Sequence, residues 1–308
     1  MKHEVWIYNN GQHERELICA EKWLRLIYEN PIGGATLPYL FSRKVLSRLY
    51  GIYCRTGFSA KSIPKFIKQN QVDMTGCQGP YKNFADFFSR EKTGISFPDK
   101  SGQLGAPCEG FASIYTNILP EEMIAAKNSL FSLAELFGDE SLAEAYRDGI
   151  MLRIRLAPAN YHRMHFFDDG TVTGSKFLDG DLFSVSPLAV NRIARLYCRN
   201  KRGLIMFSSQ HFGDVAIVEV GATFVGSIVH SFDQASETGS TTNQTDNPIE
   251  GLLPVHRGQQ ASYFLPGGSL VLVFFKKGAF IPNRTLLEQT SAGYETKICV
   301  GESIGEIL

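Results

Sequence analysis

Hydrophobic and polar positions predict several strands in the second half of the chain. Met151 to Leu156 alternates apolar and charged residues, which is typical of a half-buried strand. Val215 to Val229 is apolar and interrupted by glycines, which indicates one kinked strand or two. Leu270 to Phe275 is an unbroken run of branched and aromatic residues, which predicts a buried strand. We therefore expect a mostly antiparallel β core over residues 104–308.

The N-terminal part shows a helical pattern instead. Between residues 21 and 56, aromatic and aliphatic side chains recur at helical spacing, with arginines and lysines between them. A second short helix is expected over Ser62–Lys68 and a helical turn over Asn83–Arg90. Residues 128–147 predict a further helix, which Gly138-Asp139 could interrupt.

These patterns predict an α+β fold in which an N-terminal helical section lies on the β core. We place the helical region at residues 1–80 and the β-rich domain at residues 81–308. A basic amphipathic helix with aromatic residues can lie in a membrane interface, but the pattern alone favours a helix that packs on its own domain. The polar segment 233–250 is expected to form a surface loop or lid.

Composition and charge exclude some classes of function. The 308 residues carry 31 basic and 31 acidic side chains, and this balance argues against a nucleic-acid-binding protein. The six cysteines are scattered and show no Cys-x-x-Cys spacing, so we expect free thiols in a reducing compartment. The N-terminus lacks the apolar core of a signal peptide, and no apolar run approaches the length of about 20 residues that spans a bilayer.

The stretch Gly267-Gly-Ser269 lies at the mouth of the predicted strand 270–275. Glycine allows unusual backbone conformations and close approach to the peptide group. A serine hydroxyl beside its own upstream carbonyl is therefore a candidate for attack on that carbonyl. A tight turn that enters a strand is the commoner meaning of such a sequence.

His162 and His165 are candidates for acid–base chemistry. In an extended chain, positions three apart point to opposite faces, so one histidine could face the glycine turn and the other a substrate. Histidine titrates near neutrality and can act as general base or acid. A hydrogen-bonded structural role is the usual one for a single histidine. A metal site is not expected, because no third and fourth ligand are evident nearby.

Taken together, these stretches resemble the phosphatidylserine decarboxylase proenzymes, a pyruvoyl-dependent family. The resemblance covers nearly the whole chain, and five motifs in the family's order carry it. They are Phe87-Phe-Ser-Arg90, Tyr161-His-Arg-Met-His165, Gly180-Asp-Leu-Phe-Ser-Val185, Val220-Gly-Ala-Thr-Phe-Val-Gly-Ser227 and Gly267-Gly-Ser269.

The resemblance implies that the chain cleaves itself. Ser269 would attack the carbonyl of Gly268, an ester would form, and elimination would split the chain between these residues. A 268-residue chain and a 40-residue chain would result, the latter blocked by a pyruvoyl group derived from Ser269. No external cofactor is then needed, because the pyruvoyl carbonyl forms a Schiff base with the substrate amine and serves as electron sink.

The resemblance also assigns roles to three further residues. His165 would be the base that activates the serine, and His162 would act in decarboxylation. Glu109 would orient His165, although the family usually has aspartate at this position. Two other departures are Leu270, where a hydroxyl residue commonly follows the serine, and Ile95-Ser-Phe-Pro98, where an arginine is expected before the proline.

Three hypotheses follow from these residues. The first is a self-cleaving carboxy-lyase that converts phosphatidylserine to phosphatidylethanolamine and carbon dioxide. Its lipid substrate favours residues 21–56 as a docking element for a membrane surface, on the cytoplasmic side of the cell membrane. The second is a pyruvoyl decarboxylase of a soluble amino acid. The third, suggested by Glu109 and Leu270, is a lipid-binding relative that does not process itself. A homodimer is compatible with all three.

Overall fold

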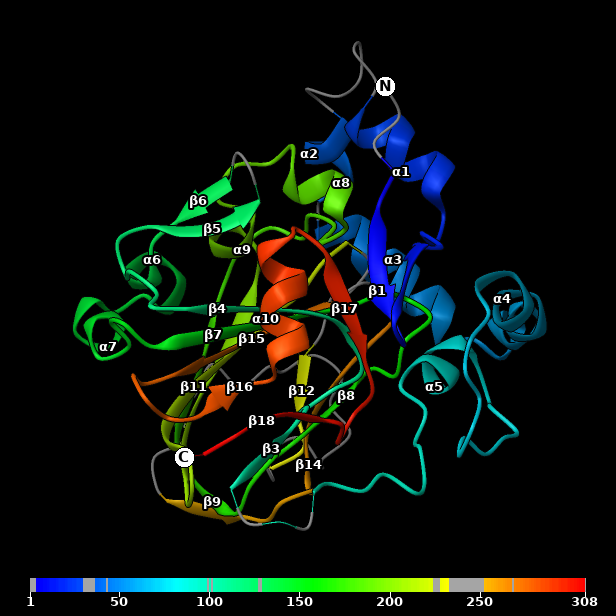
Figure 1. Cartoon of the computed structure of the whole chain (residues 1–308). Coiled ribbons are helices and arrows are strands. Elements are labelled where there is room, and N and C mark those ends of the chain that lie inside the picture. The colour runs from blue at the N-terminus through cyan, green and yellow to red at the C-terminus, as the bar shows by residue number, and fades with distance from the viewer. Residues whose placement is uncertain are drawn as a thin grey trace.

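The centre of the molecule is one large β-sheet (Figure 1). The computed structural model describes residues 4–29, 37–42, 44–98, 100, 102–126, 129–223, 228–232, 252–267 and 269–307. Within these residues ten strands pair in the order β13 (Leu253–Val255), β9 (Gly170–Leu178), β10 (Arg202–Ser209), β11 (Gly213–Val220), β15 (Ser269–Phe275), β7 (Ile150–Leu156), β4 (Gly110–Thr116), β17 (Glu295–Ile298), β1 (Trp6–Asn9) and β2 (Gln12–Arg15). Every neighbouring pair is antiparallel except β1 and β17. The expected mostly antiparallel core is confirmed.

Smaller sheets accompany the large one. The first consists of β12 (Ile228–His230), β14 (Gln260–Phe264) and β8 (Arg163–His165). The second consists of β16 (Ile281–Pro282), β18 (Ser303–Glu306) and β3 (Gln103–Gly105), and β5 (Met123–Ala126) pairs with β6 (Ser129–Phe131). The stretch expected as one or two strands over residues 215–229 is thus two strands, β11 and β12. The predicted loop 233–250 lies outside the described residues.

The N-terminal helices expected from the sequence are present. They are α1 (Glu21–Tyr28), α2 (Leu37–Phe41), α3 (Lys44–Cys54), the 3-10 helix η1 (Gly57–Ser62), α4 (Ile63–Asn70) and α5 (Phe84–Phe88). Helices α1 and α2 lie at the end of the molecule that carries the N-terminus (Figure 1). Within the described residues, no helix is both long and apolar enough to span a bilayer. The division of the chain at residues 80 and 81 stays a prediction.

The helix expected over residues 128–147 is two shorter helices. These are α6 (Leu133–Phe137) and α7 (Glu140–Glu144). Gly138 ends α6 with a φ of 65°, and the side chain of Asp139 caps α7 by accepting from the backbone N–H of Leu142. The expected interruption is confirmed, while the start is corrected, because β6 occupies Ser129–Phe131. The remaining helices are α8 (Pro187–Val190), α9 (Leu196–Arg199) and α10 (Arg284–Ser291).

Strand β15 is buried on both faces, which explains its unbroken apolar sequence. Val271, Val273 and Phe275 pack in the core on the side of β8 and β14. Leu270, Leu272 and Phe274 pack in a second core that includes residues of α6, α8 and α9. The expected buried strand is confirmed, and Ser269 is its first residue.

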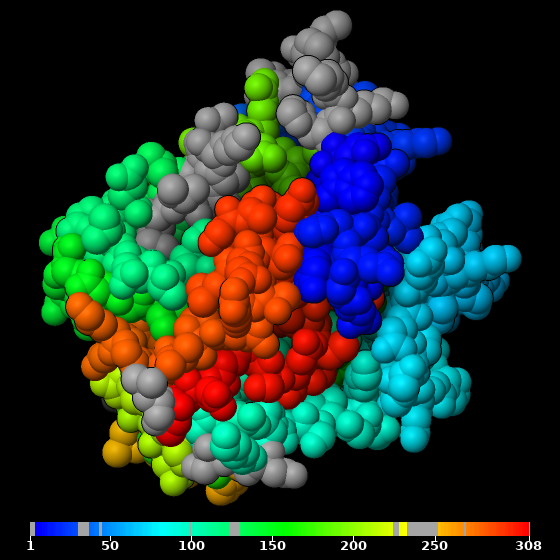
Figure 2. Space-filling view, viewed as in Figure 1, coloured from blue at the N-terminus to red at the C-terminus, as the bar shows by residue number. Residues whose placement is uncertain are grey.

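The two ends of the described chain pack against each other. The N-terminal residues, blue in Figure 2, lie directly beside the C-terminal segment, orange to red. His13 of β2 contacts Gln289 of α10 at 2.8 Å, and β1 pairs with β17. The N-terminal hairpin therefore extends the large sheet.

Candidate active site

Ser269 opens β15 in the interior of the large sheet. Its Cα partner on β7 is Leu156, and the next residue, Leu270, pairs with β11. Because side chains alternate along a strand, Ser269 points to the same face as Val271, where β8 and β14 pack. Ser269 is fully buried, and its Oγ has no hydrogen-bond partner among the described residues. Buried hydroxyls are usually paired, so Ser269 is a candidate for chemistry.

Gly267, two residues before Ser269, lies in a bend of the chain. Gly267 has a φ of 143°, which side-chain-bearing residues rarely adopt. The expected cleavage residue, Gly268, lies outside the described residues.

His162 is buried beside this turn. Its Nδ1 donates to the carbonyl oxygen of Asn160 at 2.9 Å, which leaves Nε2 as the unprotonated nitrogen. That Nε2 is sealed from solvent and has no hydrogen-bond partner among the described residues, and the backbone of Gly267 lies beside the ring. The ring of Phe88 covers the imidazole at 3.9 Å between centroids. Burial lowers the pKa of His162 to about 3, so the ring is neutral at physiological pH.

His165 belongs to β8 and does not share this environment. Its Nδ1 donates to the carbonyl oxygen of Gly258 at 2.9 Å, and its Nε2 accepts from the hydroxyl of Tyr161 at 3.0 Å. The two rings stack with centroids 5.8 Å apart. Burial lowers the pKa of His165 below its ordinary value. Of the two histidines, His162 is the one that lies beside Gly267.

Glu109 lies in the turn before β4 and is mostly buried. Its Oε1 accepts from Asn160 Nδ2 at 3.1 Å and from the backbone N–H of Tyr161 at 3.3 Å. Its Oε2 lies 3.5 Å from the ammonium nitrogen of Lys92. The carboxylate is therefore held by the side-chain amide of Asn160, the backbone N–H of Tyr161 and the ammonium group of Lys92.

Tyr161 connects Glu109 and His165. Its backbone N–H binds the carboxylate, and its hydroxyl binds the imidazole. Among the described residues, Glu109 makes no hydrogen bond to His165, and His165 makes none to Ser269. Tyr161 was not predicted as a site residue, although it stands directly before His162 in the quoted motif.

This arrangement contains the components of an intramolecular acyl transfer. A hydroxyl is a weak nucleophile and needs a nearby base. The site offers an unpaired hydroxyl, a neutral imidazole at the preceding turn, and a second imidazole linked through Tyr161 to Glu109.

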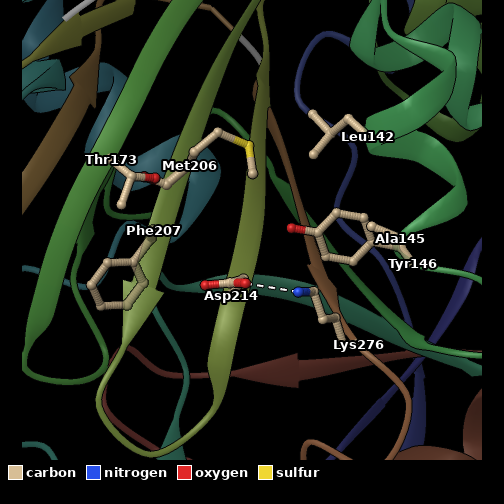
Figure 3. A pocket seen from close by; sticks show the side chains of 8 residues that line it. All are labelled: Leu142, Ala145, Tyr146, Thr173, Met206, Phe207, Asp214 and Lys276. Atoms are coloured by element: carbon tan, nitrogen blue, oxygen red, sulfur yellow. Dashed lines mark hydrogen bonds and ion pairs between the residues drawn. The ribbon is translucent and has the colours of Figure 1, made fainter. Parts of the chain in front are cut away.

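The hollow in Figure 3 is a different part of the molecule. It is lined by Leu142, Ala145, Tyr146, Thr173, Met206, Phe207, Asp214 and Lys276. Asp214 and Lys276 form an ion pair across it at 2.7 Å. Lys276 follows the far end of β15, about 20 Å along the strand from Ser269. The hollow therefore does not belong to the serine site.

Comparison of the sequence with known proteins identifies the family of this chain. The family model described as phosphatidylserine decarboxylase matches residues 82–306. A phosphatidylserine decarboxylase proenzyme of Clostridium novyi (strain NT) is 37% identical over 99% of this chain and 100% of its own length. Proenzymes of the same name from Clostridium perfringens (strain SM101 / Type A) and Clostridium kluyveri are 35% and 36% identical over 98% and 96% of this chain, and over 99% and 95% of their own lengths. With a family model that spans the β-rich part and relatives that match from end to end, the chain belongs to the phosphatidylserine decarboxylase proenzyme family.

Proposed function

We propose that this chain, which is a phosphatidylserine decarboxylase, cleaves itself between Gly268 and Ser269 before it converts phosphatidylserine to phosphatidylethanolamine and carbon dioxide. Full-length similarity to proenzymes of that name supports the activity. The structural observation that carries the proposal is the buried, unpaired hydroxyl of Ser269 at the start of β15.

The cleavage follows from attack within the chain. The Ser269 oxygen attacks the carbonyl carbon of Gly268, the peptide C–N bond breaks, and an ester and a free amine result. Elimination then removes the Cα proton of residue 269 and breaks its Cβ–Oγ bond, which releases Gly268 as a carboxylate and leaves dehydroalanine at position 269. This enamine tautomerises to an imine, water adds to the imine carbon, ammonia leaves, and a pyruvoyl ketone remains at position 269. The site fits this small group, because a pyruvoyl group is no larger than the serine that it replaces at the start of β15, opposite Leu156.

We assign the proton transfers to the histidines. His165 takes the hydroxyl proton of Ser269, with Glu109 as its supporting carboxylate. Since the Nε2 of His165 accepts from Tyr161 in the uncut chain, this assignment requires His165 to exchange Tyr161 for Ser269. Catalytic hydrogen bonds often tighten only in the reacting complex.

His162 serves the decarboxylation step. The pyruvoyl carbonyl, once formed, binds the substrate amine and accepts the electron pair left by carbon dioxide. The neutral Nε2 of His162 can accept a hydrogen bond, which suits it to position the substrate's amine. Its Nδ1 is fixed on Asn160, so the ring keeps this orientation.

Intact-mass analysis tests the proposal. The purified wild-type chain should appear as two species, of which the smaller comprises residues 269–308 and is blocked by pyruvoyl. Ser269→Ala should stay uncut, because it lacks the attacking oxygen. A folded wild-type chain that remains intact with an unmodified serine would overturn the self-cleavage and favour a non-processing relative.

We further propose that the N-terminal helices dock on the cytoplasmic surface of the cell membrane. Large apolar side chains are exposed on α3 and η1, among them Val45 at 67% and Phe58 at 66%. Trp23 of α1 is exposed at 66%. Arg48 and Arg55 are exposed close to them in the chain. Such a surface suits insertion of apolar groups between anionic lipid headgroups.

Vesicle sedimentation tests the docking. The double change Val45→Ser and Phe58→Ser should weaken binding to vesicles that contain phosphatidylserine by about tenfold, because two large apolar groups are lost. Ile281→Ser, an exposed position on β16, is the matched control and should bind as the wild type does. Equal binding by all three proteins, or turnover of free serine as fast as of the lipid, would contradict the docking.

A further inference from the structure

The chain holds a buried cation that the cleavage and decarboxylation steps do not use. Arg90 follows α5 and is only 3% exposed. Its Nη2 donates to the carbonyl oxygens of Ala159 and Asn160, each at 3.1 Å. Its Nε and Nη1 are sealed from solvent and have no hydrogen-bond partner among the described residues. The carboxylates of Glu109 and Glu91 pair with Lys92 and Arg163 instead.

Other buried arginines of the described chain are satisfied differently. Arg155 binds the carboxylates of Glu16 and Glu295. Arg202 distributes its donors over backbone carbonyls. A buried charge without sufficient partners is costly, and an unsatisfied buried group requires an explanation. The unused donors of Arg90 point to a ligand that brings its own negative charge.

Arg90 lies close to His162, so a ligand of Arg90 would lie beside this histidine. The oxygen of Asn160 that accepts from Arg90 Nη2 also accepts from His162 Nδ1, at 2.9 Å. The guanidinium and the imidazole thus donate to the same carbonyl oxygen, which links them. Phe87 lies under the guanidinium at 5.2 Å, and Phe88 covers the imidazole. The segment 87–90 therefore holds the cation and the site histidine as one unit.

We propose that Arg90 binds the phosphodiester of the lipid headgroup while the serine amine lies at position 269. The inference rests on the proposed function, since it takes Ser269 and His162 as the reacting end of the site. A guanidinium is suited to oxyanions and forms charge-assisted hydrogen bonds with them. Sealed from bulk water, its free donors attract an oxyanion more strongly than exposed ones would.

The chemistry favours the phosphodiester over the carboxylate of the same headgroup. The carboxylate loses its charge as carbon dioxide leaves, so a cation on it would stabilise the substrate more than the transition state. The phosphodiester keeps its charge from substrate to product. Binding it equally throughout lowers KM without impeding the reaction.

A binding experiment without turnover separates this inference from the reaction. The uncut Ser269→Ala chain is titrated by calorimetry with glycerophosphoserine, glycerophosphoethanolamine and free serine, with Arg90 present or changed to Met. Loss of the charge should weaken binding of both phosphodiesters by about tenfold to a hundredfold and leave serine unaffected. Arg163→Gln is the matched control, since Arg163 also lies over a ring, Tyr263 at 5.3 Å, but has hydrogen-bond partners.

Arg90→Lys keeps the charge and provides a second variant if Arg90→Met does not fold. It should bind both phosphodiesters with intermediate affinity, and in the processed enzyme it should raise KM with kcat nearly unchanged. Unchanged binding in the Arg90 variants overturns the proposal. So does weaker binding of glycerophosphoserine and serine with glycerophosphoethanolamine unaffected, because that pattern assigns Arg90 to the carboxylate.

Discussion

At the scale of single residues, the two histidines of one motif have different protonation chemistry. His162 is fully enclosed and fixed through Nδ1 on Asn160. His165 is held at both nitrogens, by Gly258 and Tyr161. Of the two rings, it is the His162 ring that lies beside Gly267.

The low pKa of His162 predicts a pH dependence of stability. Its folded-state pKa of about 3 lies below the ordinary value of 6.5, so the unfolded chain takes up the proton first as pH falls. His162 therefore costs no stability above about pH 6.5 and progressively destabilises the fold below it, by about 2 kcal/mol at about pH 5. Urea unfolding of the uncut Ser269→Ala chain at the two pH values measures this loss.

The control for this measurement is the same chain with His162→Gln, which has no titrating group at the position. Its free energy of unfolding should fall less between about pH 6.5 and about pH 5, and the difference from the parent chain is the contribution of His162. An identical fall in both proteins would show that other groups, such as His165, carry the pH dependence.

The sequence was sufficient to single out candidate site residues but not their contacts in the fold. The motif residues Ser269, His162 and His165 could be singled out because their types carry chemistry. The link from Glu109 through Tyr161 to His165 could not be predicted, because it joins a backbone N–H to a side chain across folded segments. Similarly, the sequence motif that contains Arg90 does not indicate that two of the nitrogens of this side chain have no hydrogen-bond partner.

At the scale of elements, a buried polar cluster joins the large sheet to the three-stranded sheet of β12, β14 and β8. Glu219 of β11 accepts from Ser262 of β14 and contacts His230 of β12 at 2.7 Å. The rings of Phe177 and Phe232 stack on the two sides of His230, at 4.7 and 5.0 Å. Glu219 pairs with Val271, so the cluster fixes the layer above β15 close to Ser269.

Removal of the carboxylate should loosen these layers. Glu219→Ala leaves Ser262 without its acceptor in a dry interior, which should lower the free energy of unfolding by about 3 kcal/mol. Glu288→Ala breaks an exposed ion pair with Arg284 and should change it by less than about 0.5 kcal/mol. Equal urea midpoints for the two variants would contradict a structural role of the cluster.

The periodicity of the sequence predicted elements better than their order. The central strand was recognised because residues 270–275 are apolar without interruption, which requires cover on both faces. Strand order could not be derived, because β15 pairs with strands more than fifty and more than a hundred residues away. The helix 128–147 was placed too early, since the apolar pair Leu130 and Phe131 suits β6 equally well.

At the scale of the whole molecule, the proposed cut divides the chain without dividing the fold. Residues 269–308 would supply β15, between β11 and β7, and β17, between β4 and β1. Arg155 of the large chain is buried between Glu16 and Glu295, and Glu295 would belong to the small chain. The two chains should therefore elute together in native gel filtration and separate only in denaturant.

Arg155→Met tests the buried ion pairs that join the two chains. The change leaves Glu16 and Glu295 buried without this cation, and breaking such a pair costs about 3–5 kcal/mol. In the processed protein, the urea concentration that releases the small chain should fall accordingly, as measured by gel filtration at increasing urea. Arg284→Met, which removes an exposed partner of Glu288, should leave that concentration unchanged. Release of the small chain from the wild type in plain buffer would contradict the interlocked arrangement, because two central strands would then have left the sheet without denaturant.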